Sequence, residues 1–209
     1  MKDKLEKTRL RTVQYWFSDG LNEIAFAGLC LVLGLYFLSQ AVLPEGSLLY
    51  ILLNASLVLV IIGGTLLARR LIHVLKSGIT YPRTGYVAYP NKPANRWGSA
   101  LLGMGIAALV AFLFTQQPGS LAWMPAVTGL IIAFVMLMSG FRTGLLRFYL
   151  IGFISLLLGG GLSWAGVGDI LGLSAFYGLL ALVLGLSGGC TLRTYLRSAP
   201  APEEHNDAE

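Results

Sequence analysis

Apolar residues gather into six long stretches along the chain, separated by segments that hold most of its charged residues. A helix needs roughly 20 apolar residues to cross a bilayer core about 30 Å thick, and each stretch is close to that length. The stretches are 21–43, 48–71, 98–116, 122–141, 145–165 and 171–192. The pattern predicts an all-α integral membrane protein, a bundle of six transmembrane helices.

Basic residues divide the connections between these helices into two sides. All fifteen Lys and Arg residues fall on the side that holds both termini, whereas the connections 44–47, 117–121 and 166–170 carry only Glu45 and Asp169. Because cytoplasmic segments are enriched in Lys and Arg, we expect both termini to be cytoplasmic. The expected location is a plasma membrane of the bacterial type, where this chain would be a multi-pass protein.

Composition supports a lipid environment, since 56% of the residues are hydrophobic and 12% are charged. The net charge of +5 would suggest nucleic acid for a soluble protein. Here the predicted topology accounts for it, so we expect no nucleic-acid partner. Cations beside a membrane are attracted to anionic headgroups, which makes membrane lipids on the cytoplasmic face the expected partner.

Three regions follow from these patterns. Residues 1–18 alternate charged with apolar and aromatic side chains, which is typical of a basic segment lying at the membrane interface; a frayed basic arm is the alternative. Residues 19–197 form the six-helix transmembrane domain. Residues 198–209 are polar and acidic after Pro200 and Pro202, which predicts a disordered tail.

Short outer connections predict that the six helices form three hairpins, and similar sequences at the ends of helices suggest that the hairpins are pseudo-repeats. In lipid, small residues let helix backbones approach, and two predicted helices carry them at intervals of four. The run 159–161 consists of Gly alone and is expected to thin or loosen the fifth helix. The predicted packing residues are Ser99, Gly103, Ala107 and Ala111 in the third helix, and Ala181, Gly185 and Gly189 in the sixth.

Two carboxylates, Asp19 and Glu23, stand four residues apart at the cytoplasmic start of the first helix and so share one helix face. They are candidates for holding a cation or a proton, because ionisable groups inside membrane spans are often functional. The structural alternative is that Asp19 caps the helix and Glu23 interacts with the helix dipole.

Asn54 is the strongly polar residue near the middle of the otherwise apolar second helix. Such side chains usually hydrogen-bond across helices, so we favour a packing role over contact with a solute.

The connection 73–97 is the longest, and it interleaves aromatic residues with cations. A connection of this length without regular structure is uncommon unless it has a function, so we expect a surface that meets headgroups or a cytoplasmic protein. Its segment 80–87, TYPRTGYV, resembles uncharacterised prokaryotic multi-spanning membrane proteins, a resemblance that implies no activity. The candidate residues are Tyr81, Arg83, Tyr86, Tyr89, Lys92 and Arg96.

The sequence contains no pattern that predicts a cofactor, a metal site or a catalytic residue. The two histidines, His73 and His205, cannot form a haem pair inside the bundle, and two separated cysteines have no zinc spacing. Ser163 and Ser187 have no histidine base within reach. We therefore expect a non-catalytic accessory or interaction subunit, with a protein partner or a second copy. The alternatives are a small-solute or ion transporter, followed by a lipid-modifying enzyme.

Overall fold

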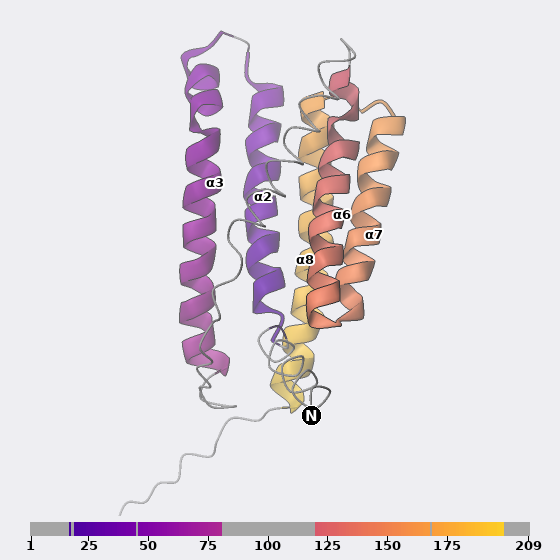
Figure 1. Ribbon diagram of the computed structural model, residues 1–209. Coiled ribbons are helices and arrows are strands. Elements are labelled where there is room, and N and C mark those ends of the chain that lie inside the picture. Colours follow the sequence, from indigo (N-terminus) through magenta and orange to yellow (C-terminus); the bar gives the residue numbers. More distant parts are fainter. Residues whose placement is uncertain (1–16, 18, 45, 81–119, 168, 199–209) are drawn as a thin grey trace, which may run out of the picture.

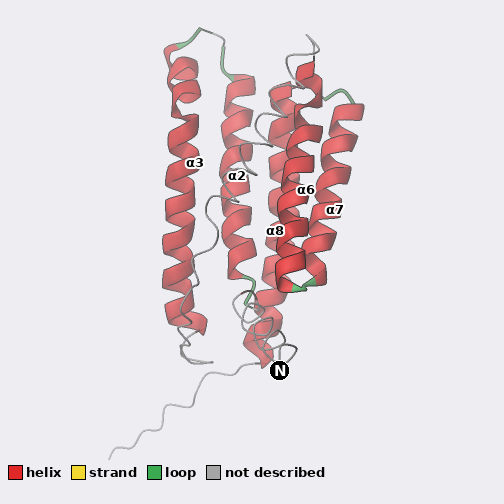
Figure 2. Ribbon diagram, in the orientation of Figure 1, coloured by secondary structure: helices red, strands yellow, loops and turns green. Residues whose placement is uncertain are grey.

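The structure is a computed structural model that describes residues 17, 19–44, 46–80, 120–167 and 169–198. In this part of the chain five helices are long and apolar enough to cross a membrane, and they run side by side (Figure 1). No strand occurs among the described residues (Figure 2). The helices are α2 (Leu21–Val42), α3 (Leu48–Leu75), α6 (Met124–Thr143), α7 (Leu146–Trp164) and α8 (Asp169–Ser198), with a π-helix η1 (Lys76–Thr80) and a 3-10 helix η2 (Ser120–Trp123).

These five helices occupy five of the six predicted stretches, which confirms a multi-helix apolar bundle. The predicted third stretch, 98–116, lies outside the described residues, together with its packing residues Ser99, Gly103, Ala107 and Ala111. The predicted interfacial segment, apart from Phe17, and residues 199–209 of the predicted tail lie outside as well.

Two predicted helix ends are wrong. α3 continues beyond residue 71 to Leu75, and η1 extends to Thr80, so the connection predicted from residue 73 begins as helix. α8 continues beyond residue 192 to Ser198. Hydropathy marks where a helix leaves the lipid, whereas the helix itself continues until its backbone is interrupted. No Pro occurs at 72–80 or 193–198 to remove a backbone donor.

α2 packs most extensively against α8, and small residues allow this close approach. A Cβ on Gly34 would lie 3.1 Å from the backbone nitrogen of Gly178, and one on Gly188 would lie 2.9 Å from the carbonyl oxygen of Gly20. Gly20 adopts φ +71° immediately before α2, a conformation that favours glycine. The helix backbones therefore touch where larger residues would separate them.

The predicted small-residue seam of the sixth helix is partly wrong. Ala181 is buried and Gly185 faces Ala27 of α2, but a Cβ on Gly189 would meet open space. Gly188 occupies the contact instead. An α-helix has 3.6 residues per turn, so a seam must mix steps of three and four, whereas a strict interval of four drifts off the face.

α6 and α7 form the second closely packed pair. A Cβ on Gly159 would lie 2.5 Å from the carbonyl oxygen of Pro125, and one on Gly152 would lie 3.2 Å from that of Ala133. The Ser155 hydroxyl donates to the Gly129 carbonyl at 3.1 Å. Of the two effects expected of the glycine run 159–161, a thinner helix agrees with Gly159, which packs directly on α6. A loosened helix does not, because α7 continues through the run.

The two pairs meet in an apolar core. Phe176, Leu180 and Leu184 of α8 are buried there, with Met136 of α6 and Ile151 of α7. The hairpin partners α2 and α3, and likewise α7 and α8, are in contact, although less extensively than the two pairs above. The pseudo-repeat stays a prediction.

α3 lies at the edge of the bundle beside α2 (Figure 1). None of its residues from Leu48 to Leu75 is buried, in contrast to the other four long helices. Its attachment therefore depends on few contacts.

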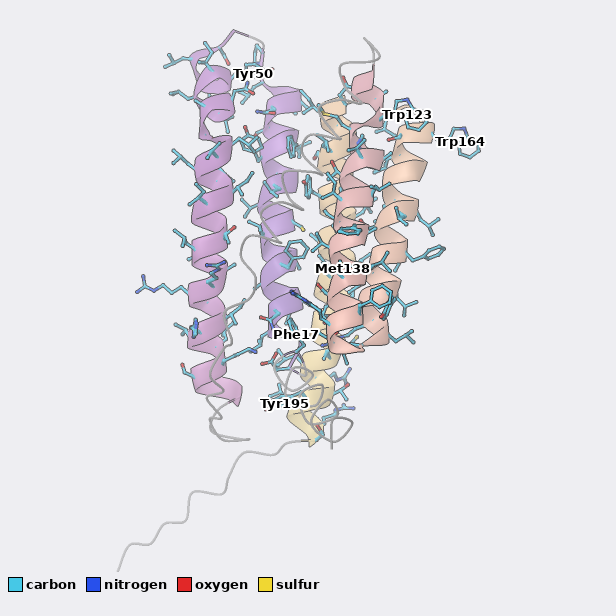
Figure 3. All side chains as sticks on the ribbon, in the orientation of Figure 1. Phe17, Tyr50, Trp123, Met138, Trp164 and Tyr195 are labelled. Atoms are coloured by element: carbon cyan, nitrogen blue, oxygen red, sulfur yellow. The ribbon has the colours of Figure 1, made fainter. Side chains whose placement is uncertain are left out.

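The two ends of the bundle differ in composition. Tyr50, Trp123 and Trp164 lie toward one end, whereas Phe17 and Tyr195 lie toward the other (Figure 3). We call the first the aromatic end, since Trp and Tyr concentrate at membrane interfaces. The second, at which α2 and α7 begin and α3, α6 and α8 finish, we call the basic end; it carries Arg69, Arg70, Arg142, Arg147, Arg193 and Arg197.

Replacing Gly159 by Ala should destabilise the α6–α7 pair, because the added methyl group meets backbone atoms that cannot move aside. Overpacking of this kind costs about 1–3 kcal/mol, measured as a lower unfolding temperature in detergent. Gly160→Ala is the matched control: its Cβ would meet nothing within 4 Å, so we expect no loss of stability. Equal effects of the two variants on the unfolding temperature would contradict close packing of Gly159 against α6.

Candidate functional site

Asp19 and Glu23 are both buried at the basic end of the bundle. Asp19 stands two residues before Leu21, the first residue of α2, and its Oδ1 accepts a hydrogen bond from the Leu21 backbone N–H at 3.2 Å. This contact satisfies one of the backbone donors that a helix start leaves open. The capping alternative therefore describes part of what Asp19 does.

Asp19 also forms an ion pair with the helix that follows. The Nζ atom of Lys76, the first residue of η1, lies 3.2 Å from Oδ2 of Asp19, and both side chains are buried. The pair ties the far end of α3 to the start of α2. A helix with no buried residue of its own thus gains a fixed position at the basic end.

Glu23 faces the opposite way, toward α7 and α8. Its Oε1 lies 2.8 Å from Nε of Arg147, and its Oε2 accepts a hydrogen bond from the Ser187 hydroxyl at 2.7 Å. Glu23 sits in the first turn of α2, Arg147 in the first turn of α7 and Ser187 late in α8. One carboxylate therefore joins three helices.

Arg147 uses its remaining donors to extend this network. Its guanidinium donates to the Thr191 hydroxyl at 2.9 Å and to the backbone carbonyl of Phe17. It also lies over the Phe148 ring, 5.4 Å from the ring centre, within range of a cation–π attraction. We call Asp19, Glu23, Lys76, Arg147, Ser187 and Thr191 the ion-pair cluster.

The contact between Arg147 Nε and Glu23 Oε1 is ionic in character. The atoms are 2.8 Å apart, and neither of them forms a hydrogen bond with a residue that the structure describes. Charge attraction gains strength where water is excluded. Removing either partner would leave the other charge buried and unpaired, which is the costly situation.

The two carboxylates do not converge on a common ligand. Asp19 points to α3 and Glu23 to α7 and α8, and each has its own cation. No group of three or more His, Cys, Asp or Glu side chains among the described residues could hold a metal ion. These ion pairs hold helices together. Either carboxylate could bind another cation or a proton only after its own ion pair had broken.

Asn54 takes part in a smaller polar cluster nearer the aromatic end. Its Oδ1 accepts from the Gln40 side chain at 3.0 Å, and Gln40 also donates to the Tyr36 hydroxyl at 2.8 Å. Tyr36 in turn donates to the carbonyl of Leu53 at 2.9 Å. Asn54 thus makes the bond across helices that its position predicts, and it joins α3 to α2. We call Tyr36, Gln40 and Asn54 the amide cluster.

The tyrosines and cations predicted as a surface fall outside the described residues. They are Tyr81, Arg83, Tyr86, Tyr89, Lys92 and Arg96. Their role stays a prediction, and the structure places only the start of their connection, as the π-helix η1 that follows α3.

Sequence reasoning missed the partners of the carboxylates. The sequence pattern assigns Arg147 to orientation alone, Lys76 to the basic residues of the long connection, and Ser187 to a nucleophile without a base. One signal was present: two acidic residues at the start of a span need counter-charges, and the topology places Lys76 and Arg147 at the same end of the bundle. The choice of partner depends on helix neighbours, which the sequence pattern leaves open.

Replacing Arg147 by Gln should leave Glu23 buried without its counter-charge. Removing one partner of a buried ion pair costs about 3–5 kcal/mol, so the unfolding temperature in detergent should fall clearly. Arg142→Gln is the matched control, because Arg142 is exposed in the last turn of α6 and should change stability by no more than about 0.5 kcal/mol.

The double variant Glu23→Gln/Arg147→Gln removes both charges and should recover part of the lost stability. If Arg147→Gln were as stable as Arg142→Gln, the ion pair would not hold the bundle together.

Comparison with known proteins gives no relative from which a role could be transferred. No protein-family model, curated protein or solved structure matches the chain. The function must therefore be argued from the ion-pair cluster, the amide cluster and the exposed helix α3.

Proposed function

We propose that this chain is a non-catalytic accessory or interaction subunit of a plasma membrane, with both termini cytoplasmic and the connection 73–97 as its contact surface. The observation that supports this most directly is the state of α3. This helix leads into the connection, has no buried residue along Leu48–Leu75, and is joined to α2 by polar contacts toward each end. A partner would add the burial that α3 lacks.

The buried carboxylates also favour a structural role over a chemical one. Asp19 and Glu23, the candidate bases for an enzyme acting on lipids, are paired with Lys76 and Arg147. A general base must be within hydrogen-bond reach of its substrate, and both carboxylates are already in contact with a cation inside the bundle. These contacts weigh against the enzyme alternative.

The proposed orientation rests on the distribution of charge between the two ends. The arginines of the described helices lie at the basic end, and the exposed Trp123 and Trp164 lie toward the aromatic end. The positive-inside rule assigns the basic end to the cytoplasm. The connection 73–97 starts from that end, where a cytoplasmic protein could reach it.

Photo-crosslinking in cells tests the proposed surface. A photoreactive amino acid at Tyr81, Tyr86 or Tyr89 should capture the same protein from each position, since all three belong to one surface. The matched control is Phe141, which is exposed at the basic end on α6 and should capture none of it. Mass spectrometry of the crosslinked bands identifies the partner, and a reporter fused to the C-terminus checks that it is cytoplasmic.

The capture should weaken when Arg83, Lys92 and Arg96 are replaced together by Gln, since the surface is expected to use their charge. Three tyrosine positions that capture nothing, or capture no more than position 141, would contradict an interaction subunit.

Transport is the second candidate, and the buried ion pairs are the observation that favours it. Ionisable residues inside membrane spans often mark ion or proton pathways, and Glu23 with Arg147 lies within the bundle. In this alternative, breaking the Asp19–Lys76 and Glu23–Arg147 pairs would open the basic end to a solute. The ion-pair cluster would then be a gate rather than a fixed support.

Flux measurements in proteoliposomes show whether the ion-pair cluster acts as a gate for a solute or as a fixed support. For a transporter, Glu23→Gln should reduce solute or proton flux at least tenfold, because neutralising the carboxylate removes the charge that the gate requires. Asp169→Asn, at the opposite end of α8, is the control. The variants should be compared at equal folded fraction, and flux that is unchanged by Glu23→Gln counts against transport.

A further inference from the structure

α3 carries a continuous exposed lane on the side that faces away from α2. Leu59, Ile62 and Leu66 are 71%, 53% and 60% exposed, and they are spaced by three and four residues, which places them on one helix face. The face turned to α2 is different: it includes Gly64, whose Cβ would meet Leu29. The lane is therefore an apolar strip about two turns long.

The lane ends in cations that have no partner in the described structure. Arg69 and Arg70 follow Leu66 by three and four residues, His73 follows them by one further turn, and all three side chains are exposed. The ion pairs among the described residues use Lys76 and Arg147 instead. Two guanidinium groups thus lie at the end of an apolar strip, and no carboxylate among the described residues pairs with them.

The depth of these cations fits a headgroup. Arg69 lies 21 residues beyond Leu48, which is about 32 Å along a helix that rises 1.5 Å per residue, and the hydrocarbon core is about 30 Å thick. Leu48 begins α3 near Tyr50 at the aromatic end. Arg69 and Arg70 therefore fall at the opposite interface, where lipid phosphates lie.

We propose that this lane binds one anionic phospholipid. An acyl chain lies along Leu66, Ile62 and Leu59, and the headgroup phosphate is held by Arg69 and Arg70. Guanidinium groups match phosphate oxygens in pairs of hydrogen bonds, and the adjacent strip offers the apolar surface that a free phosphate would not use. The charge favours a lipid over a neutral partner helix. The site shares the exposure of α3 with the proposed function, and it differs in assigning a lipid rather than a protein to the outer face of that helix.

Native mass spectrometry of the full chain tests the site. The protein is exchanged into detergent containing equal amounts of phosphatidylglycerol and phosphatidylcholine, and the bound lipids are counted. Each Arg near an anionic surface favours the anion by about fivefold, so phosphatidylglycerol should predominate by about tenfold or more. Arg69→Gln/Arg70→Gln should abolish this preference, whereas Arg193→Gln/Arg197→Gln, an equal loss of exposed charge on α8, should leave it intact.

Two further arms test the lane itself. Ile62→Ala/Leu66→Ala should reduce the bound phosphatidylglycerol without any change of charge, and inorganic phosphate added to the wild type should not displace it. Circular dichroism and gel filtration check that every variant is folded. Equal losses in both arginine pairs would indicate diffuse attraction, displacement by phosphate would indicate a headgroup-only site, and a bound protein in place of lipid would indicate a partner helix. Each of these results overturns the proposal.

Discussion

A carboxylate removed from water needs a counter-charge nearby, and the burial of Glu23 imposes this requirement on the whole basic end of the bundle. Arg147 meets it from α7, and Ser187 adds a hydrogen bond from α8. Because Glu23 lies in the first turn of α2, the ion pair can form only when the starts of α2 and α7 and the later part of α8 are adjacent. The two closely packed helix pairs therefore depend on it for their relative placement.

The small-residue seams work together with this ion pair. Gly188 of α8 immediately follows Ser187 and packs against Gly20, just before α2, and against Glu23 in the first turn of α2. A larger residue at that position would separate the backbones and would also carry Ser187 and Thr191 away from their partners. In lipid, burying apolar surface between helices adds little stability. Close packing at Gly188 brings the helices near enough for the ion pair of Glu23 to form, and the ion pair in turn holds them at that distance.

Hydropathy predicted five of the described helices because the length and composition of one apolar stretch are enough to predict a membrane-spanning helix. Packing was harder to predict, as Gly188 and Gly189 show: both are small, and only the rotation of α8 toward α2 decides which one is in contact. The partners of Asp19 and Glu23 were harder still. The topology placed Lys76 and Arg147 at the correct end, but the pairing of Arg147 with Glu23 depends on how the start of α7 lies relative to the start of α2. A pattern along one chain does not contain that information.

Two pairs of cations at the basic end differ in what neutralises their charge. Lys76 and Arg147 are compensated by carboxylates inside the bundle, so their charge is already used for stability. Arg69 and Arg70 are exposed on the helix that has no buried residue, and the described structure offers them no carboxylate. The binding free energy of an anionic lipid is most favourable where the cations have no counter-charge and the neighbouring apolar surface is exposed. Both conditions meet on α3, which is why we propose the lipid on the outer face of that helix rather than at the buried ion pairs.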